Sequence, residues 1–374
     1  MNLKRLIGFL LLSALVGATL SACAKSEGGG KKSFLQVGEF AINRISPART
    51  EVTDGSGRKL VLIPRNAPLP GDCDPSQVIR VPVKSVVAYG DFDVATLAVL
   101  GVLEETLVGV TRPEKRWYRD DVKRCFRSGR IVYLGEPNSL DYEQLKQQQP
   151  ELVLTWDPSV IPMLDELKIP AVVTSTPVAM CLNARMGFVK FLAPFFNREK
   201  EAEAYFRRVN DALTALRARS AKSRDKKKVM WGDIYEKRVL VEPGNAWVGE
   251  LLKYAETDYL FNDVYGTSCI EISVERFLTS GEDADVYFTY RGRSSGVTSK
   301  EALARVNPLV KNIRPITHGT VYLPLPHYSQ SGDRLDEIFT ELAAIVHPDV
   351  YPGYRLKFFE ELPATEPADK GKPL

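Results

Sequence analysis

The chain has 374 residues, 44% of them hydrophobic, and its 50 Lys and Arg against 47 Asp and Glu give a formal net charge of +3. Such near-neutrality disfavours a nucleic-acid partner, which needs Lys and Arg clustered on one face. The length exceeds what a single hydrophobic core usually supports, so we expect two lobes.

The N-terminus has the pattern of an export signal. Lys4 and Arg5 precede an uncharged segment, residues 6–24, which contains the run LSAC at residues 20–23. A basic start, an apolar run and small residues before a cleavage point are typical of signal peptides. A retained transmembrane anchor is the alternative, because the segment nearly reaches the length of a minimal membrane span. Leucine, two small residues and a cysteine resemble a bacterial lipobox, so we predict that residues 1–22 are removed and that Cys23 is lipidated.

Lipidation of Cys23 predicts an extracytoplasmic protein, anchored to a bacterial membrane on its periplasmic side or at the cell surface. Removal of residues 1–22 takes away two positive charges and lowers the net charge from +3 to about +1. Residues 23–34 are polar and rich in glycine. This composition is typical of a flexible tether.

From Lys84 onward, short apolar runs alternate with amphipathic ones. The runs SVVAY, LVGVT, ELVLTW and PAVVTS favour strands, whereas VATLAVLG, LDYEQLKQQQ and VIPMLDELK favour helices. This alternation is typical of parallel βα units. We therefore predict an N-terminal α/β lobe over residues 35–182.

A long amphipathic helix is predicted in the middle of the chain, from about residue 197 to residue 222. Asn197 is the expected N-cap, and acidic residues follow in the first turn, where the helix dipole favours them. One apolar stripe has spacings of three, four and three residues and consists of Phe206, Val209, Leu213 and Leu216. We predict that residues 183–226 form a rigid helical linker laid across both lobes.

The βα alternation then resumes. It begins with KVMWGDIY, continues through WVGELLKYA, SVERFLTSG, ADVYFTYR and TVYLPLP, and closes with RLDEIFTELAAIVH. These runs predict a C-terminal α/β lobe over residues 227–362 and a disordered tail over residues 363–374. The predicted fold is therefore two α/β (Rossmann-like) lobes joined by one long rigid α-helix. Open α/β sheets bind ligands at the carboxyl ends of their strands, so we expect a ligand cleft between the lobes.

The common catalytic and nucleotide-binding motifs GxSxG, GxxxxGK[ST], GxGxxG and HExxH are missing from the sequence. The three histidines, His318, His327 and His347, have no i, i+4 spacing, which disfavours a metal site built from several imidazoles. His347 precedes a proline at a helix end, so we expect it to cap that helix. His327 follows a predicted strand and is either a cleft residue or a plain loop residue.

Four cysteines remain after residue 23, and no two of them have CxxC spacing. In an oxidising compartment an even number of cysteines favours disulfides, and buried thiols are the alternative. Spacing alone leaves all three pairings open for Cys73, Cys125, Cys181 and Cys269.

Aromatic and arginine side chains recur just beyond the predicted strand ends. Flat rings with a few hydrogen-bond donors suit a large planar or amphipathic ligand. We therefore predict a ligand cleft lined by Tyr89, Arg116, Trp117, Tyr118, Trp156, Trp231, Trp247, Tyr290, Arg291, His327 and Tyr328.

Several segments together resemble the helix-linked (class III) substrate-binding proteins of ABC importers for cobalamin, ferric siderophores and haem. They are SLDYEQLKQQQPELVLTW, IPAVVTST, the mid-chain helix, IEISVERFLTSGEDADVYFTY and ELAAIVHPDVYP. The resemblance extends from about residue 59 to about residue 362. It implies a monomeric lipoprotein that is no enzyme and has no cofactor of its own. Such a protein captures an iron chelate, haem or corrinoid in the interlobe cleft and delivers it to a permease dimer with its ATPase.

The resemblance also implies roles for two glutamates. In that family each lobe carries an exposed glutamate that docks onto arginines of the permease, and the matching positions here are Glu143 and Glu275. Charge-assisted pairs with Arg would fix the orientation of docking. Without the resemblance, both residues are explained as first-turn glutamates stabilised by the helix dipole.

A disulfide is implied in the same way. The cobalamin-binding member of the family has a bridge between comparable places, which implies a bond between Cys181 and Cys269. Cys73 and Cys125 are then left to pair within the first lobe.

Two other classes of protein remain as alternatives. A surface-anchored α/β enzyme would use Asp91, Asp93 or Asp157 with His327, because carboxylates near strand ends also act as acids and bases. Asp91 and Asp93 are equally well explained as helix N-caps. A zinc or manganese importer subunit of related architecture needs more histidines than the three present.

Overall fold

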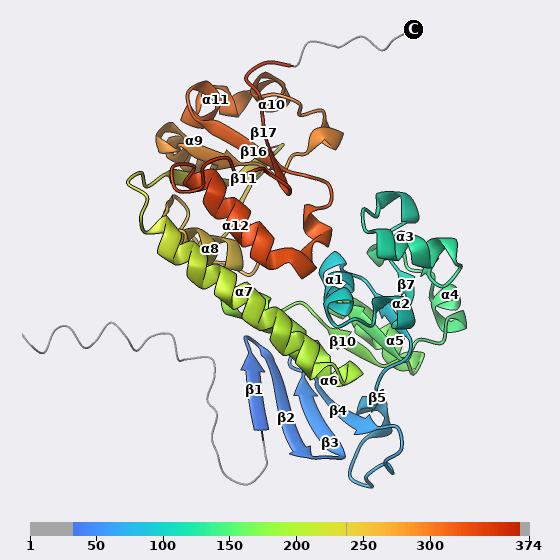
Figure 1. The fold of residues 1–374 in the computed structure, drawn as a ribbon. Helices are drawn as coiled ribbons and strands as arrows, with labels where there is room; N and C mark the ends of the chain where they lie inside the picture. The colour runs from blue at the N-terminus through green and yellow to red at the C-terminus, as the bar shows by residue number, and fades with distance from the viewer. Residues whose placement is uncertain (1–32, 237, 367–374) are drawn as a thin grey trace, which may run out of the picture.

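The computed structural model describes residues 33–236 and 238–366. The molecule is built on three sheets, with helices that cover and connect them. Figure 1 shows the N-terminal sheet at the bottom, the N-terminal lobe beside it and the C-terminal lobe above. The predicted signal peptide and Cys23 lie outside the described residues. The predicted tether is two residues too long, because the first strand already begins at Ser33.

The first sheet is a five-stranded meander that the sequence patterns did not separate from the N-terminal lobe. Its strands lie in sequence order, antiparallel except for the last pair, which is parallel. One face packs on a helix of the linker, where the ring of Phe40 lies 5.1 Å from that of Phe188 and 4.7 Å from that of Phe191. The strands are β1 (Ser33–Val37), β2 (Phe40–Ser46), β3 (Arg49–Thr53), β4 (Lys59–Pro64) and β5 (Val78–Val81).

The N-terminal lobe has a five-stranded, all-parallel sheet with the order β10-β9-β6-β7-β8. Its short strands are almost entirely buried, which explains their uninterrupted apolar runs. The strands are β6 (Val86–Ala88), β7 (Leu107–Val110), β8 (Val132–Tyr133), β9 (Leu152–Thr155) and β10 (Ala171–Val173). The helices are α1 (Asp91–Val99), α2 (Leu103–Thr106), α3 (Asp120–Arg127), α4 (Tyr142–Gln147) and α5 (Ile161–Glu166).

The linker consists of two helices, α6 (Leu182–Phe196) and α7 (Glu199–Ser220). The long helix was predicted correctly, but Asn197 does not cap its N-terminus. Asn197 instead ends α6 in the left-handed conformation, with φ 56°, which asparagine tolerates better than most residues. Arg198 is the N-cap of α7, and acidic residues follow in the first turn as expected.

The apolar stripe of α7 is packing surface, as predicted. Val209, Leu213 and Leu216 are buried, whereas Phe206 is half-buried beneath the ammonium group of Lys190. In Figure 1, α7 runs from the N-terminal half of the molecule up to the C-terminal lobe, beside α12 (Leu335–Val346).

The C-terminal lobe has a seven-stranded mixed sheet. Four strands, β13, β11, β15 and β16, are parallel to one another, while β12, β14 and β17 pair antiparallel. The strands are β11 (Lys228–Tyr235), β12 (Arg238–Val241), β13 (Asp258–Tyr259), β14 (Ile270–Ile272), β15 (Val286–Phe288), β16 (Thr320–Pro324) and β17 (Phe359–Glu361). The remaining helices are α8 (Trp247–Tyr254), α9 (Val274–Asp283), α10 (Lys300–Val306) and α11 (Arg314–Thr317).

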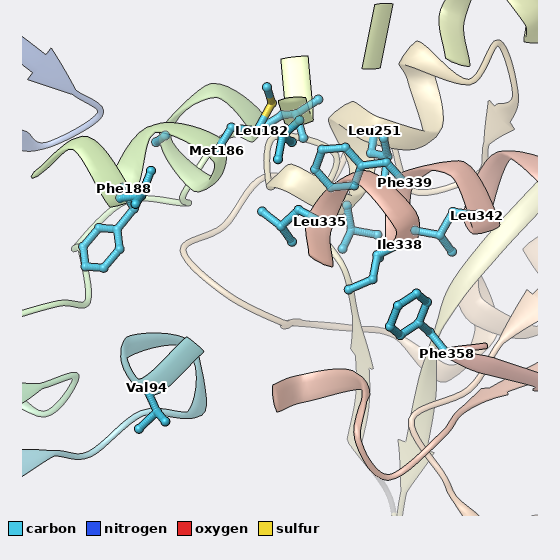
Figure 2. Close-up of a cluster of buried hydrophobic side chains, with 14 of the residues drawn as sticks. Val94, Leu182, Met186, Phe188, Leu251, Leu335, Ile338, Phe339, Leu342 and Phe358 are labelled. Atoms are coloured by element: carbon cyan, nitrogen blue, oxygen red, sulfur yellow. The ribbon is translucent and has the colours of Figure 1, made fainter. Parts of the chain in front are cut away.

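One continuous core extends from the first sheet through the linker into the C-terminal lobe. Figure 2 shows part of it, where Leu335, Ile338 and Phe339 of α12 lie close to Leu251 of α8. A shared core resists independent movement of the parts that it joins. The two-lobed, helix-linked architecture is thus confirmed, and the lobes meet through packed side chains as well as through the linker.

The predicted tail begins too early. Pro363 and Ala364 accept hydrogen bonds from the backbone at the start of α10, and Glu366 pairs with Arg305 at 2.6 Å. Residues 363–366 therefore belong to the C-terminal lobe.

Candidate functional site

A cleft of about 450 Å³ lies at the carboxyl ends of the N-terminal strands and is bounded on one side by the C-terminal lobe. The N-terminal lobe supplies most of its wall, α6 supplies Arg185, and the C-terminal lobe contributes Ser329. Two aromatic side chains that were predicted for the cleft line it but differ in their exposure to solvent. Trp156 is 46% exposed, whereas Tyr89 is only 5% exposed and its hydroxyl is buried without a hydrogen-bond partner.

The start of α1 carries two carboxylates into this cleft. Gly90 is the N-cap, so Asp91 and Asp93 occupy the first turn and are not caps themselves. Asp91 makes a two-pronged ion pair with Arg112, with both N–O distances at 2.8 Å. Such a pair neutralises both partners.

Asp93 is buried beneath the cleft floor. It accepts a hydrogen bond of 3.2 Å from the Thr174 hydroxyl. Burial raises the pKa of Asp93 to about 7, although Thr174, the backbone of Gly90 and the charge of Arg185 act in the opposite direction. The carboxyl group therefore changes its charge near neutral pH.

Arg185 is the unusual cation of the cleft. Its guanidinium lies 3.4 Å above the ring centroid of Phe92 and 5.4 Å from that of Trp247. Its Nε is buried without a hydrogen-bond partner, and no ion pair within residues 33–236 and 238–366 includes it. Burial lowers the pKa of Arg185, while Tyr328, Tyr205, Asp93 and Glu242 raise it through their charges. A guanidinium stacked on aromatic rings but without a carboxylate is suited to hold an anionic group of a ligand.

A segment of the C-terminal lobe, residues 328–334, closes one side of the cleft, and we call it the strap. The Ser329 hydroxyl donates a hydrogen bond to Asp91 at 2.8 Å, and Asp333 forms an ion pair with Arg119 at 2.7 Å. Gly332 approaches α1 so closely that a Cβ atom there would lie 2.7 Å from the Phe92 ring. The strap therefore ties the two lobes together beside the ligand site.

The side-chain amide of Gln330 also connects the strap to the N-terminal lobe, through two hydrogen bonds. The Gln330 side chain accepts from the Tyr118 backbone N–H at 2.8 Å and donates to the Arg116 carbonyl at 2.9 Å. Tyr118 and His327 flank the strap in a second hollow of about 330 Å³, outside the main cleft. His327 Nε2 lies 2.8 Å from the Lys357 carbonyl, so this ring is held against its own lobe.

On the C-terminal lobe, Glu242, Cys269 and the predicted cleft residue Tyr290 form a cluster that we call the C-terminal wall. Glu242 is near enough to Arg185 to act on its pKa, but the three residues are not among those that line the space of about 450 Å³. The Tyr290 hydroxyl donates to Glu242 at 2.8 Å, and Cys269 Sγ lies 3.1 Å from that hydroxyl and 3.4 Å from Glu242 Oε1. Burial raises the pKa of the Glu242 carboxyl and, with the nearby Glu242, that of the Cys269 thiol to about 11. Tyr328 packs against Phe359 on the same lobe.

Three predicted cleft residues have other roles. Trp117 and Trp231 are buried in the cores of their lobes, at 2% and 3% exposure. The Trp117 indole donates to the Arg112 carbonyl, and Trp231 stacks on Phe288 with ring centroids 4.5 Å apart. Arg291 points into its own lobe, where it pairs with the buried carboxylate of Asp233 at 3.2 Å.

Tyr89, Arg116 and Trp156 do line the cleft as predicted. Arg116 is paired with Glu136 at 2.8 Å. Trp247 begins α8 as expected and lies against the Arg185 guanidinium.

Sequence reasoning missed Arg112, Arg185 and Ser329. Arg112 follows β7 by two residues, so the rule used for the aromatics would have found it. Arg185 lies between buried neighbours early in α6. The signal in the sequence was a charged residue within a largely apolar run.

The carboxylates proposed for an enzyme do not converge on a histidine. Asp157 caps a short helical turn by accepting from the Ser159 N–H at 2.9 Å, and His327 is held by a backbone carbonyl. Asp91 is occupied by Arg112. His347 ends α12 as its C-cap, as predicted, and contacts the Ala255 carbonyl.

The predicted disulfides are absent from the structure. Cys73, Cys125 and Cys269 carry free thiols, and Cys269 is engaged by Glu242 and Tyr290. Pairing of Cys181 with Cys269 thus stays a prediction for the oxidised protein. Cys125 is a buried residue of α3 and Cys73 lies in a loop of the first sheet, and their pairing also stays a prediction.

The two predicted docking glutamates occupy equivalent places on the two lobes. Glu143 is exposed in the first turn of α4, which Asp141 caps, and Glu275 is exposed in the first turn of α9, which Ser273 caps. Neither glutamate belongs to an ion pair within the described ranges. Both carboxylates are therefore available to a partner.

Two properties of residues 33–236 and 238–366 bear on other functions. None of the helices there is both long and apolar enough to span a bilayer. No group of three or more His, Cys, Asp and Glu side chains in these ranges is placed to hold a metal ion.

Comparison with known proteins identifies relatives of this fold. An uncharacterized lipoprotein of Methanocaldococcus jannaschii is 26% identical over 324 residues, which cover 82% of this chain and 76% of the relative. A periplasmic heme-binding protein from Pseudomonas aeruginosa matches with a TM-score of 0.57 at 19% identity, covering 76% of this chain and 100% of the other. Helicobacter pylori CeuE, in a Ni-His complex, matches with a TM-score of 0.60 at 17% identity, covering 82% and 90%. The model of the periplasmic binding proteins matches residues 86–324, more than half of the chain. The helix-linked fold and this match show that the chain belongs to the periplasmic binding protein family.

Proposed function

We propose that this protein captures an anionic metal chelate or tetrapyrrole in the interlobe cleft and delivers it to an ABC permease. The observation that carries the proposal is the Arg185 guanidinium, which lines the cleft without a carboxylate partner. A buried cation without an anion is costly, and an anionic ligand would compensate it.

The other two arginines of the cleft support the same ligand class less directly. Arg112 is neutralised by Asp91 and Arg116 by Glu136, so a ligand must compete with a carboxylate for either of them. We therefore expect Arg185 to contribute most to the affinity for an anionic ligand. Arg112 and Arg116 would instead discriminate between ligands by the positions of their acidic groups.

The aromatic wall supports a ligand with a flat face. Trp156 exposes its indole to the cleft, and Phe92 and Tyr89 line the same space of about 450 Å³. Burial of a planar ligand against such rings would supply most of the binding free energy. A haem-binding protein and a nickel-bound protein of the same fold favour a metal-containing ligand, and a lipoprotein relative favours anchoring through Cys23.

Identification of the ligand tests the proposal. The protein is purified from its own host and its native mass and absorption spectrum are recorded; a bound haem, corrinoid or ferric chelate is the expected result. The ligand-free protein is then titrated with haemin, a ferric siderophore and cobalamin, following tryptophan fluorescence, to which Trp156 in the cleft contributes. We expect one of them to bind with a Kd at or below about 1 μM. Binding of none, together with a ligand-free native mass, contradicts the proposal.

Delivery is tested separately, through Glu143 and Glu275. Replacing both by Ala should abolish uptake by the reconstituted importer, because each lobe loses its charge-assisted contact with the permease. Ligand affinity should not change, since both side chains are exposed on helices away from the cleft. The matched control replaces Glu105 and Glu201, which are also exposed first-turn glutamates. Normal uptake by the Glu143 and Glu275 variant would refute docking but leave the binding proposal intact.

A further inference from the structure

Three potential metal ligands meet on the C-terminal lobe, and one of them, Glu242, lies within electrostatic reach of Arg185 in the cleft. Glu242 follows β12, Cys269 precedes β14 and Tyr290 follows β15 by two residues. Their donor atoms lie 2.8, 3.1 and 3.4 Å from one another. The sheet therefore brings a carboxylate, a thiol and a phenol together from three separate strands.

The two separations that involve Cys269, 3.1 and 3.4 Å, match those of neighbouring ligands on one metal ion, whereas the Tyr290–Glu242 separation of 2.8 Å is slightly shorter. Bonds of roughly 2.0–2.3 Å to oxygen and sulfur place adjacent donors about 3.0–3.4 Å apart. We propose that Glu242, Cys269 and Tyr290 form a three-donor site for a first-row transition-metal ion. The three groups exchange hydrogen bonds in the absence of metal, and the ion would take the place of their protons.

The charge of Glu242 supports a cation at this point independently of the donor spacing. Its side chain exchanges hydrogen bonds with the neutral Tyr290 hydroxyl and Cys269 thiol, and within residues 33–236 and 238–366 it has no ion pair with Lys or Arg, although Arg185 is near enough to act on its pKa. Nearby Asp233, on the same sheet, is by contrast compensated by Arg291. A half-buried carboxylate without a counter-ion favours the uptake of a cation.

The donor types define the class of metal. Thiolate and phenolate ligands disfavour Mg²⁺ and Ca²⁺, which prefer six or more oxygens, and favour transition metals such as iron, cobalt and zinc. Three protein ligands leave coordination positions open toward the cleft. An additional ligand, such as water or a group of a chelator, would complete the shell.

The inference goes beyond the proposed function, because these donors need no chelator to hold an ion. The metal site and the proposed ligand site are also compatible with each other. The N-terminal wall presents Arg185 and the C-terminal wall presents Glu242, close enough for each to shift the pKa of the other. A ligand that combines a metal with an anionic group would bridge the two walls.

Cobalt(II) chloride is the probe, because Co²⁺ does not oxidise thiols and its bond to a thiolate produces a charge-transfer absorption. The full protein, kept reduced with a phosphine, is dialysed against Co²⁺. We expect one bound ion per chain with a thiolate–cobalt band. The variants Cys269→Ser, Glu242→Gln and Tyr290→Phe should each weaken binding by at least about tenfold. Cys269→Ser should also abolish the band.

The matched control is Cys73→Ser, which removes a thiol distant from the cleft and should leave both binding and band unchanged. Circular dichroism of every variant establishes that it is folded. The proposal is overturned if the wild type binds no Co²⁺, if the folded Cys269→Ser variant retains the band, or if Cys269 of the protein purified without reductant is in a disulfide with Cys181. Titration of the same variants with the chelate separates the two proposals, because loss of Co²⁺ binding with normal chelate affinity refutes only the metal site.

Discussion

The two walls of the cleft arise from similar sequence patterns but differ in chemistry. The N-terminal wall exposes Trp156 beside the cations Arg112 and Arg185. The C-terminal wall presents Glu242 with two neutral groups, and its tryptophan, Trp231, is buried. An aromatic residue after a short apolar run therefore does not by itself indicate a ligand site.

The difference depends on where each strand ends. β9 ends at Thr155, so Trp156 leaves the sheet and faces the cleft. β11 continues to Tyr235, which keeps Trp231 within the strand, stacked on Phe288 of the neighbouring β15. Tertiary pairing with β12 and β15 extends this strand beyond its apolar start.

The largest expected effect comes from exchanging the two tryptophans for alanine. Trp231→Ala should destabilise the protein by about 3–5 kcal/mol, because it leaves a cavity beneath Phe288 and Phe359. Trp156→Ala should change the free energy of unfolding by less than about 1 kcal/mol, yet weaken ligand binding. Denaturant unfolding and ligand titration of both variants measure this contrast. Equal destabilisation by the two substitutions would mean that the walls do not differ as described.

Much of the fold follows from local patterns. The apolar runs of β6, β9 and β10 are short and fully buried, and that of β7 nearly so, and their composition alone indicates parallel strands. The capping residues Asp141 and Ser273 start α4 and α9 where the sequence indicates, which also places Glu143 and Glu275 in first turns. Local signals of this kind do not depend on the rest of the molecule.

Features that depend on distant contacts were not predictable. The N-terminal meander is stabilised by packing on α6, nearly 150 residues later in the sequence, as in the contact of Phe40 with Phe188. The left-handed Asn197 splits the linker, although asparagine is also a good N-cap. The strap reaches the N-terminal lobe through Gly332, whose small size matters only because Phe92 lies against it.

Replacing the arginines of the N-terminal wall provides the next largest effect. Arg185→Gln should weaken binding of the anionic ligand by about 10- to 100-fold, since an interaction with a charged group contributes roughly 1.5–3 kcal/mol. Arg116→Gln should have a smaller effect, because Glu136 already neutralises Arg116. Isothermal titration with the identified ligand measures both variants. A larger loss for Arg116→Gln would show that the ion-paired arginine, not the unpaired one, recognises the ligand.

The smallest expected effect is a pH dependence that comes from Asp93. Its pKa, raised by burial to about 7, means that the carboxyl is largely neutral below that pH and charged above it. The stability that the neutral form contributes is therefore complete below the ordinary pKa of 3.8 and is lost as the pH rises through about 7. Ionised Asp93 also competes with an anionic ligand for the field of Arg185. Ligand affinity should thus fall by up to about tenfold between about pH 6 and about pH 8.

Asp93→Asn should remove this pH dependence and keep the affinity near its value at low pH, because the amide stays neutral and can still accept from Thr174. The matched control is Asp211→Asn, an exposed residue of α7, which should reproduce the wild-type pH profile. An unchanged slope in Asp93→Asn would assign the pH dependence to the ligand's own acidic groups.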